Sequence, residues 1–320
     1  MPKKSLLGCS FPLAIGVILA LLALFLLGFA SGPLGASVFG DLGLPDWLSV
    51  SQPHPELPAE VIFHVLEFPV TNSVIATWVT VLVLVGFSYA VSRRVRIIPR
   101  RWQGLLEFIL GSLLSFCQSV AGERNGRRFF PVVATIFLFV GFNAWLALLP
   151  GFGSIVVHTG HGEAHLLRAA NTDINTPLAV ALMSFVFVEY FGIRMLGAGY
   201  MKKFFNFGQF LSGLGQLARG RPLTGLSGIF NGIIQIFIGL IEFLSEMVRV
   251  VSFTLRLFGN MTAGEILLLM AVFLVPYLFA LPFYGLELLV GFVQALIFGG
   301  LTLIFLTVAV TPHSHEGHEK

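Results

Sequence analysis

The sequence predicts an all-α, multi-pass membrane protein with about six membrane helices, including a long, strongly tilted helical hairpin near the C-terminus. Charged residues make up only 11% of the 320 residues, against about 25% in an ordinary globular chain. Hydrophobic residues make up 56%, Phe alone occurs 33 times, and the mean hydropathy is +0.89. A soluble fold could not bury so much apolar surface, so lipid must solvate the chain.

The rest of the composition excludes several classes of function. A net charge of +3 on so apolar a chain does not indicate nucleic-acid binding, and Cys9 and Cys117 are too few for a disulfide framework. The sequence has no G-x-x-x-x-G-K-[ST] motif and no polar segment long enough to house a nucleotide site. We therefore expect no cofactor, no metal ion, no nucleic-acid partner and no catalytic site of the chain's own.

Stretches with few or no charges predict the membrane spans, because a span needs about 20 apolar residues. They lie at residues 5–40 with an apolar centre at 13–29, at 68–92, at 132–149, at 177–196 and at 222–311. The last stretch is long enough for two helices.

The basic residues orient these spans, since loops rich in Lys and Arg stay in the cytoplasm. Residues 31–71 hold five acids and no basic residue, whereas residues 93–128 hold eight arginines. Residues 194–221 hold five basic residues and no acid. We therefore expect both termini in the cytoplasm, with interfacial helices on that side at 103–120 and 202–217.

Residues 1–31 allow two interpretations. Their basic start and small-residue exit at Gly28-Phe29-Ala30 resemble a cleaved signal segment, but the apolar stretch exceeds the usual ~7–15 residues. We favour a retained membrane anchor. The other expected segments are an outer-side segment (32–71), transmembrane helices with cytoplasmic interfacial helices (72–222), the tilted hairpin (223–311) and a cytoplasmic tail (312–320).

Residues 222–275 are too long for one upright span. At 1.5 Å per residue they would form a helix of about 80 Å, whereas the hydrocarbon core is about 30 Å thick. No polar loop divides them. Two long, tilted helices joined near Pro276 and Pro282 satisfy this geometry, because tilt lengthens the path and Pro interrupts the backbone hydrogen bonds.

These two helices carry ionisable residues at membrane depth, where a central Arg costs roughly 2.5–3.5 kcal/mol on insertion scales. A functional role is therefore the default hypothesis for them. Helical periodicity places Glu242, Arg249 and Asn260 within about 40° of Arg256, on one face, and Glu265 about 180° away. Glu246 is three residues from Arg249 and could pair with it.

A single hinge near residues 275–276 would bring two pairs of polar residues level. Arg256 and Gln294 have their midpoint there, and so do Glu265 and Glu287. Glu287 and Gln294 are seven residues apart and share a face of the second helix. Two pairs that share one hinge argue against coincidence.

The run Arg256-Leu257-Phe258-Gly259-Asn260-Met261-Thr262-Ala263-Gly264-Glu265 resembles subunit a of the bacterial F-type ATP synthases, and its pattern is highly specific to that family. Residues 171–175 and 294–298 also resemble family members, so the resemblance covers roughly residues 60–311. It implies a proton-translocating subunit of the bacterial plasma (inner) membrane. The implied partners are a ring of c subunits, the peripheral-stalk b subunits, the remaining synthase subunits and the lipid bilayer.

The resemblance also implies residue roles. Arg256 is similar to the stator arginine that faces the ring, with Asn260 and Gln294 as its polar neighbours. The family positions that line two aqueous half-channels are matched here by Glu242, Ser252, Glu265 and Glu287. Those of the outer access pathway are matched by Asp173 and Asn175. Some members carry His at the position of Glu287, so a role that needs an imidazole is in doubt and two carboxylates could share a proton instead.

The residues make this chemistry intelligible. A fixed positive charge attracts a passing carboxylate, and Arg suits the task because it stays protonated where a buried Lys could lose its proton. The chain has no repeated carboxylates of its own, so the moving acid must belong to a partner. The ion, proton or sodium, would be selected mostly by that partner.

Two other functions are compatible with a polytopic membrane chain. An autonomous secondary transporter with an intramembrane Arg/Glu site would predict an inverted repeat, but the first half holds no second copy of the Arg256 motif. A purely structural subunit would have little reason to place Arg256, Glu265 and Glu287 at membrane depth.

Two His-rich strings remain. His158, His161, Glu163 and His165 could bind a metal or collect protons, but we favour a solvated loop. The His-rich end of the chain is expected to be a disordered cytoplasmic tail.

Overall fold

The computed structural model describes residues 11–40, 52, 59–93, 101–149, 151–159, 162–201, 204, 207–219 and 222–311. Six helices in these ranges are long and apolar enough to cross a membrane. They are α1 (Phe11–Ser31), α3 (Asn72–Ser92), α4 (Arg101–Ala147), α5 (Asn175–Leu196), α8 (Pro222–Leu274) and α9 (Ala280–Val310). The predicted fold class is thereby confirmed. The tail at 312–320 lies outside the described residues.

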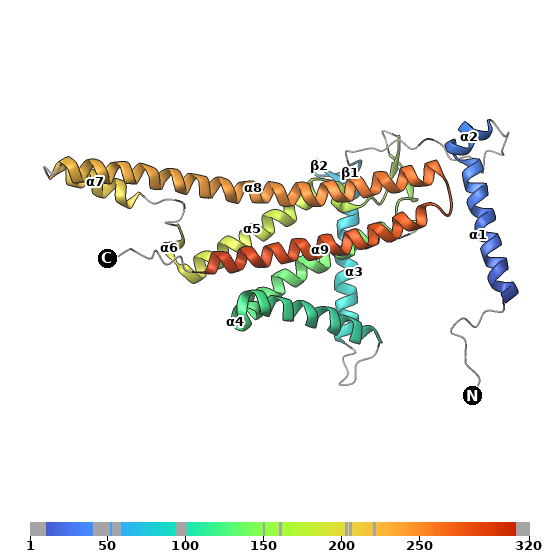
Figure 1. Cartoon of the computed structure of the whole chain (residues 1–320), viewed down its shortest axis with the longest axis horizontal. Helices are drawn as coiled ribbons and strands as arrows, with labels where there is room; N and C mark the ends of the chain where they lie inside the picture. Colours follow the sequence, from blue (N-terminus) through green and yellow to red (C-terminus); the bar gives the residue numbers. More distant parts are fainter. Residues whose placement is uncertain are drawn as a thin grey trace.

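The C-terminal hairpin is the dominant feature of the molecule. α8 is one continuous helix of 53 residues and α9 has 31, and the two are joined through residues 275–279. The two helices run side by side along the longest axis, whereas α1 and α3 run across that direction (Figure 1). If α3 stands upright in a bilayer, the hairpin is therefore strongly tilted, as the length of residues 222–275 predicted.

The N-terminal helix touches the turn of this hairpin. A Cβ atom at Gly28 would overlap the carbonyl oxygen of Pro276, and one at Gly32 would overlap that of Leu274. Only glycine allows the two backbones to approach so closely. The rest of α1 is almost entirely exposed.

The core lies where α4, α5, α8 and α9 meet. Its fully buried side chains include Phe129, Val133, Leu257, Leu303 and Leu306. The backbone of α4 is non-helical at Gly122, where φ is 79°, so α4 consists of two helices joined by a sharp kink. The first of them covers the interfacial helix expected at 103–120.

Two small antiparallel sheets were not predicted. Residues 68–71, expected as the start of a span, form β2 (Phe68–Thr71), which pairs with β1 (Val61–Val65). The expected solvated loop around residue 160 contains β3 (Val156–Thr159) and β4 (Gly162–His165), with Val157 opposite Ala164. A short apolar run such as residues 68–71 looks the same whether it enters a bilayer or pairs with a neighbouring strand, whereas β4 (Gly-Glu-Ala-His) has no apolar run that could indicate a strand.

Short helices complete the chain. α2 (Pro33–Phe39) follows α1, the 3₁₀ helix η1 (Ala170–Thr172) precedes α5, and α6 (Ala198–Met201) follows it. α7 (Gly208–Ala218) packs along the first part of α8, where Gly225 and Gly232 let the backbones approach closely. A helix was expected at 202–217, and α7 forms its second part.

Candidate ion pathway

An exposed polar strip follows α8 at a spacing of four residues. Ser252, Arg256 and Asn260 are all exposed, so their side chains lie on one outward face of the helix. The Arg256 guanidinium carbon lies 5.8 Å from the centroid of the Phe253 ring. Glu242, ten residues before Ser252 on α8, is partly buried. An exposed Arg flanked by hydroxyl and amide groups can attract an anionic group on a neighbouring surface.

Gln294 links this strip to α9. Its Nε2 donates a hydrogen bond of 3.0 Å to the backbone carbonyl oxygen of Arg256, and its side chain is buried. The prediction that Arg256 and Gln294 are level is thereby confirmed. Because Gln294 holds the backbone and not the guanidinium, the charged end of Arg256 stays available at the surface.

Glu265 and Glu287 are also level, but they do not hydrogen-bond to each other. Glu287 is buried, and its carboxylate lies directly against Gly264, the residue before Glu265. Glu265 instead forms an ion pair with Arg168, in which Nε and Oε1 lie 3.5 Å apart. The common hinge is thus confirmed. The two carboxylates are not in hydrogen-bond contact, so the structure gives no direct support for a proton shared between them.

Arg168 is a site residue that the sequence did not single out. It lies between β4 and η1, and its side chain is only 12% exposed. The pair joins two segments almost a hundred residues apart, a separation at which no helical spacing could reveal a contact. The only available signal was a lone basic residue in an otherwise weakly charged outer loop.

Several buried polar atoms around η1 lack a hydrogen-bond partner within the part of the chain that the structure describes. They are the side-chain amide nitrogen of Asn143 on α4, both side-chain polar atoms of Asn171 in η1, and Oγ1 of Thr262 and Oε2 of Glu265 on α8. η1 packs against α4 and α8, so these atoms come from elements that meet. Buried polar groups in proteins are otherwise nearly always paired with protein or water.

Asp173 ties two helix starts together at this end. Ser73 on α3 donates a 2.6 Å hydrogen bond to its Oδ2, and Asn175 donates to its Oδ1 from the backbone N at 3.1 Å and from Nδ2 at 2.9 Å. Asp173 is buried and Asn175 is exposed. The bonds from Asn175 tie Asp173 to the first residue of α5, which gives Asp173 a structural role in addition to any role in transport.

A second group of polar residues near these contacts was not singled out from the sequence either. Glu60 accepts hydrogen bonds at Oε2 from the Asn72 side chain at 3.3 Å and from the His165 backbone N at 2.9 Å. Asn72 also donates to the carbonyl oxygen of His165 at 3.2 Å. These bonds join the segment before β1 to α3 and β4, so they hold the loops at this end of α3 in place.

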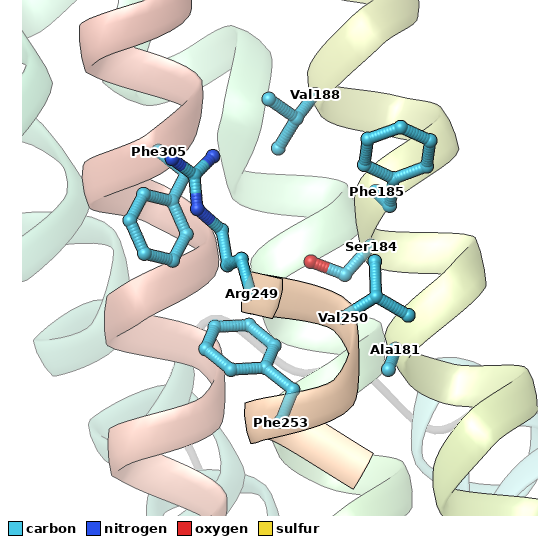
Figure 2. A pocket seen from close by; sticks show the side chains of 8 residues that line it. All are labelled: Ala181, Ser184, Phe185, Val188, Arg249, Val250, Phe253 and Phe305. Atoms are coloured by element: carbon cyan, nitrogen blue, oxygen red, sulfur yellow. The ribbon is translucent and has the colours of Figure 1, made fainter. Parts of the chain in front are cut away.

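A cavity lies between α5, α8 and α9, beside the part of α8 that precedes Arg256 in the sequence. Figure 2 shows Arg249 and the Ser184 hydroxyl in it, among otherwise apolar side chains. Arg249 donates to Glu246 at 2.5 Å, as their spacing suggested, and its guanidinium carbon lies 3.7 Å from the centroid of the Phe305 ring. The remaining lining residues are Ala181, Phe185, Val188, Val250 and Phe253.

More polar groups adjoin this cavity. The Ser184 hydroxyl lies 2.8 Å from that of Thr302, which itself donates to the carbonyl oxygen of Phe298. Tyr200 donates a 3.2 Å hydrogen bond to Glu189. Burial, followed by the charges of Glu189 and Glu246, raises the pKa of Tyr200 above its usual value, so its hydroxyl remains a donor at neutral pH.

The His-rich strand pair gives no metal site among the residues that the structure describes, where no group of three or more His, Cys, Asp or Glu side chains could hold an ion. His158 stands opposite Glu163 across the pair of strands. His161 lies outside the described residues.

Comparison with known proteins identifies the family. Residues 74–307 match the family model described as ATP synthase A chain. The chain belongs to the ATP synthase subunit a family. It is 32% identical to ATP synthase subunit a of Gloeobacter violaceus over 242 residues, which cover 76% of this chain and 85% of the relative. It is likewise 32% identical to ATP synthase subunit a of Desulfosudis oleivorans over 267 residues, or 82% and 99% of the two chains.

Membership of the subunit a family decides between the functions considered above. It supports a proton-translocating subunit of an ATP synthase over an autonomous secondary transporter. Together with the six apolar helices, it also supports a multi-pass bacterial membrane protein. The matched range begins inside α3, so α1, α2 and the β1–β2 pair precede the part that the family model covers.

Proposed function

We propose that this chain is the stator that guides protons to and from a ring of c subunits, and that the exposed strip Ser252, Arg256 and Asn260 faces that ring. The peripheral-stalk b subunits would hold it still against the moving ring. The observation that carries the proposal is the exposure of Arg256 at mid-helix, with Gln294 fixing its backbone. A permanently charged side chain that is exposed on the outward face of a membrane helix requires an anionic partner to offset its cost in the membrane.

The outer half-channel would begin at Asp173 and Asn175 and reach Glu265 and Glu287. Its support is the set of buried polar atoms around η1 that lack partners among the described residues, because such atoms are stable only when water or an ion reaches them. Glu287, against Gly264, would then pass a proton toward the ring. A carboxylate can take up and release a proton, so this role needs no imidazole.

The inner half-channel would use the cavity between α5, α8 and α9. Ser184 and Arg249 place two polar groups in its otherwise apolar lining, and Glu246, Glu189 and Tyr200 adjoin it. Glu242 and Ser252 would continue this path along α8. Since loops rich in basic residues face the cytoplasm, this end opens to the cytoplasm and the C-terminus lies on the same side.

Arg256 would separate the two paths. A carboxylate of the ring that comes beside it is drawn into the ionised form, so it must have released its proton before it passes. A free proton meets a fixed positive charge and is repelled. Rotation of the ring is then the only way for a proton to go from one half-channel to the other, which couples flux to rotation.

Replacing Arg256 tests this proposal. The complete ATP synthase carrying Arg256→Ala should assemble, because Ala is a good helix former, but it should lose ATP synthesis and ATP-driven proton pumping and gain a passive leak. Arg256→Lys should also fail to couple, since Lys lacks the planar guanidinium and can lose its proton. The measurements are ATP synthesis and proton flux in reconstituted vesicles, with co-purification of the c ring and the b subunits as the assembly check.

Arg127→Ala is the matched control. Arg127 and Glu123 form an exposed pair at 3.1 Å, and such surface pairs contribute little. Wild-type synthesis in the Arg256→Ala vesicles would refute the stator mechanism. Failure of the ring to co-purify with the wild-type chain would refute the proposed partner.

A further inference from the structure

The ion pair between Arg168 and Glu265 differs from the ion pairs Arg127–Glu123 and Arg249–Glu246 of the described residues in joining distant segments. Arg127–Glu123 and Arg249–Glu246 each lie within about one turn of a helix, whereas Arg168 comes from the loop between β4 and η1 and reaches across to α8. Its side chain is 12% exposed and that of Glu265 is 33% exposed. Removing Glu265 leaves the Arg168 charge largely desolvated, and removing Arg168 leaves a partly buried carboxylate, so either change costs more than breaking a surface pair.

The two oxygens of the Glu265 carboxylate have different surroundings. Oε1 lies 3.5 Å from the Arg168 guanidinium, whereas Oε2 is buried and has no hydrogen-bond partner among the described residues. On the same helix, Thr262 also has a buried hydroxyl without a described partner. Asn171, three residues after Arg168, has two such atoms. Unpaired polar atoms therefore flank the ion pair on both the loop and the helix.

We propose that Arg168 is a positioning residue for the outer half-channel: it holds one carboxylate oxygen of Glu265 and leaves the other to receive the water or proton that enters from outside. The inference rests on the proposed function, since it needs an outer path that ends at Glu265. It adds a residue from the loop before η1 to a pathway whose two glutamates come from α8 and α9.

The geometry also explains why the loop before η1 has a defined position. His165, three residues before Arg168, is linked through Asn72 to Glu60 by hydrogen bonds. Asp173, five residues after Arg168, accepts a hydrogen bond from Ser73. The loop is thus fixed on both sides of Arg168. A long, flexible Arg side chain needs such support to hold a carboxylate in one orientation.

A double-mutant cycle tests the assignment in the complete ATP synthase in inverted membrane vesicles. Arg168→Ala should slow ATP-driven proton pumping about fivefold while the c ring still co-purifies, and Arg168→Lys should stay within about twofold of wild type because it keeps a charged donor. Arg168→Gln, which keeps a donor without the charge, should fall between the two and replaces Arg168→Ala if that variant fails to assemble. Arg127→Ala is again the control.

The decisive measurement is the effect of Arg168→Ala in a Glu265→Gln background. If Arg168 acts through Glu265, the double variant should pump no more slowly than Glu265→Gln alone, because the carboxylate that Arg168 holds is already gone. Equal slowing in both backgrounds, or a Lys variant as slow as the Ala variant, would overturn the assignment. A wild-type rate for Arg168→Ala would do the same. Arg256→Ala is measured in parallel. If Arg256→Ala abolishes pumping while Arg168→Ala pumps normally, only the role of Arg168 is refuted. If Arg256→Ala still pumps, the stator proposal is refuted.

Discussion

The two polar regions that flank Arg256 along α8 are built in different ways. In the region proposed as the outer half-channel, Arg168 reaches Glu265 and Ser73 reaches Asp173, so each contact joins segments about a hundred residues apart. On the inner side, the ion pair is local, since Glu246 pairs with Arg249 within one turn of α8, and the long-range polar contact joins two neutral hydroxyls, those of Ser184 and Thr302. The outer region also holds buried polar atoms without described partners, whereas Arg249 is satisfied by Glu246 and the Phe305 ring.

This difference indicates how each region responds to change. The outer region depends on the docking of a loop, so it should be sensitive to the loss of single charges and to small displacements of a carboxylate. The inner region is a cavity among packed helices, so it should be sensitive to side-chain volume. Four experiments test this contrast, from the largest expected effect on transport to the smallest.

The outer carboxylates should be the more sensitive targets. Glu265→Leu and Glu287→Leu should each slow ATP-driven proton pumping about tenfold or more without opening a leak, because each removes a polar group from the outer path while Arg256 stays in place. Glu287→His should be the best-tolerated change at its position, since imidazole also carries protons. Proton uptake by inverted vesicles measures all three. Unchanged pumping in both Leu variants would exclude these residues from the path.

A glycine next to Glu287 offers a test that leaves every polar group in place. A Cβ at Gly264 would overlap the Glu287 carboxylate, so Gly264→Ala must displace that carboxylate and should slow pumping about threefold to tenfold. Gly285→Ala is the matched control, because nothing lies within 4 Å of a Cβ at that position. Equal pumping rates for the two Ala variants would show that the position of the Glu287 carboxylate is unimportant.

The inner cavity should respond to volume more than to polarity. Ser184→Leu places a large side chain in the cavity and should slow pumping about twofold to fivefold, whereas Ser184→Ala loses only the contact with Thr302 and should have less effect. Ser227→Leu, at an exposed position on α8, is the control. If the Ala and Leu variants of Ser184 are slowed equally, the hydroxyl matters and the cavity volume does not.

Cysteine labelling tests on which side of the membrane each region opens, and it should leave proton transport unchanged. A cysteine at Ser51 should react with an impermeant thiol reagent added outside intact cells, and one at Asn125 only after permeabilisation, because basic residues surround the latter. The buried Cys117 should stay unreactive in both experiments. The reverse labelling pattern would exchange the outer and inner assignments of the two regions.

The main features of the hairpin were predictable from the sequence because they depend on local rules. The length of residues 222–275 required a tilted helix, and counting outward from a hinge near Pro276 was enough to pair Arg256 with Gln294. The pairing of Glu246 with Arg249 followed from their spacing alone. The two small sheets were missed, because an apolar run as short as β2 does not reveal its environment and β4 (Gly-Glu-Ala-His) has no apolar run at all.

Sequence alone therefore determined the membrane class, the number of spans, the hinge and the candidate residues on α8 and α9, since hydropathy and helical periodicity operate within a single segment. Tertiary structure decided which of these residues meet a partner. Glu265 pairs with Arg168 and not with Glu287, and Phe305 on α9 covers Arg249. Both contacts depend on how separate segments pack, and the side chains that face each other across a packed interface obey no sequence spacing.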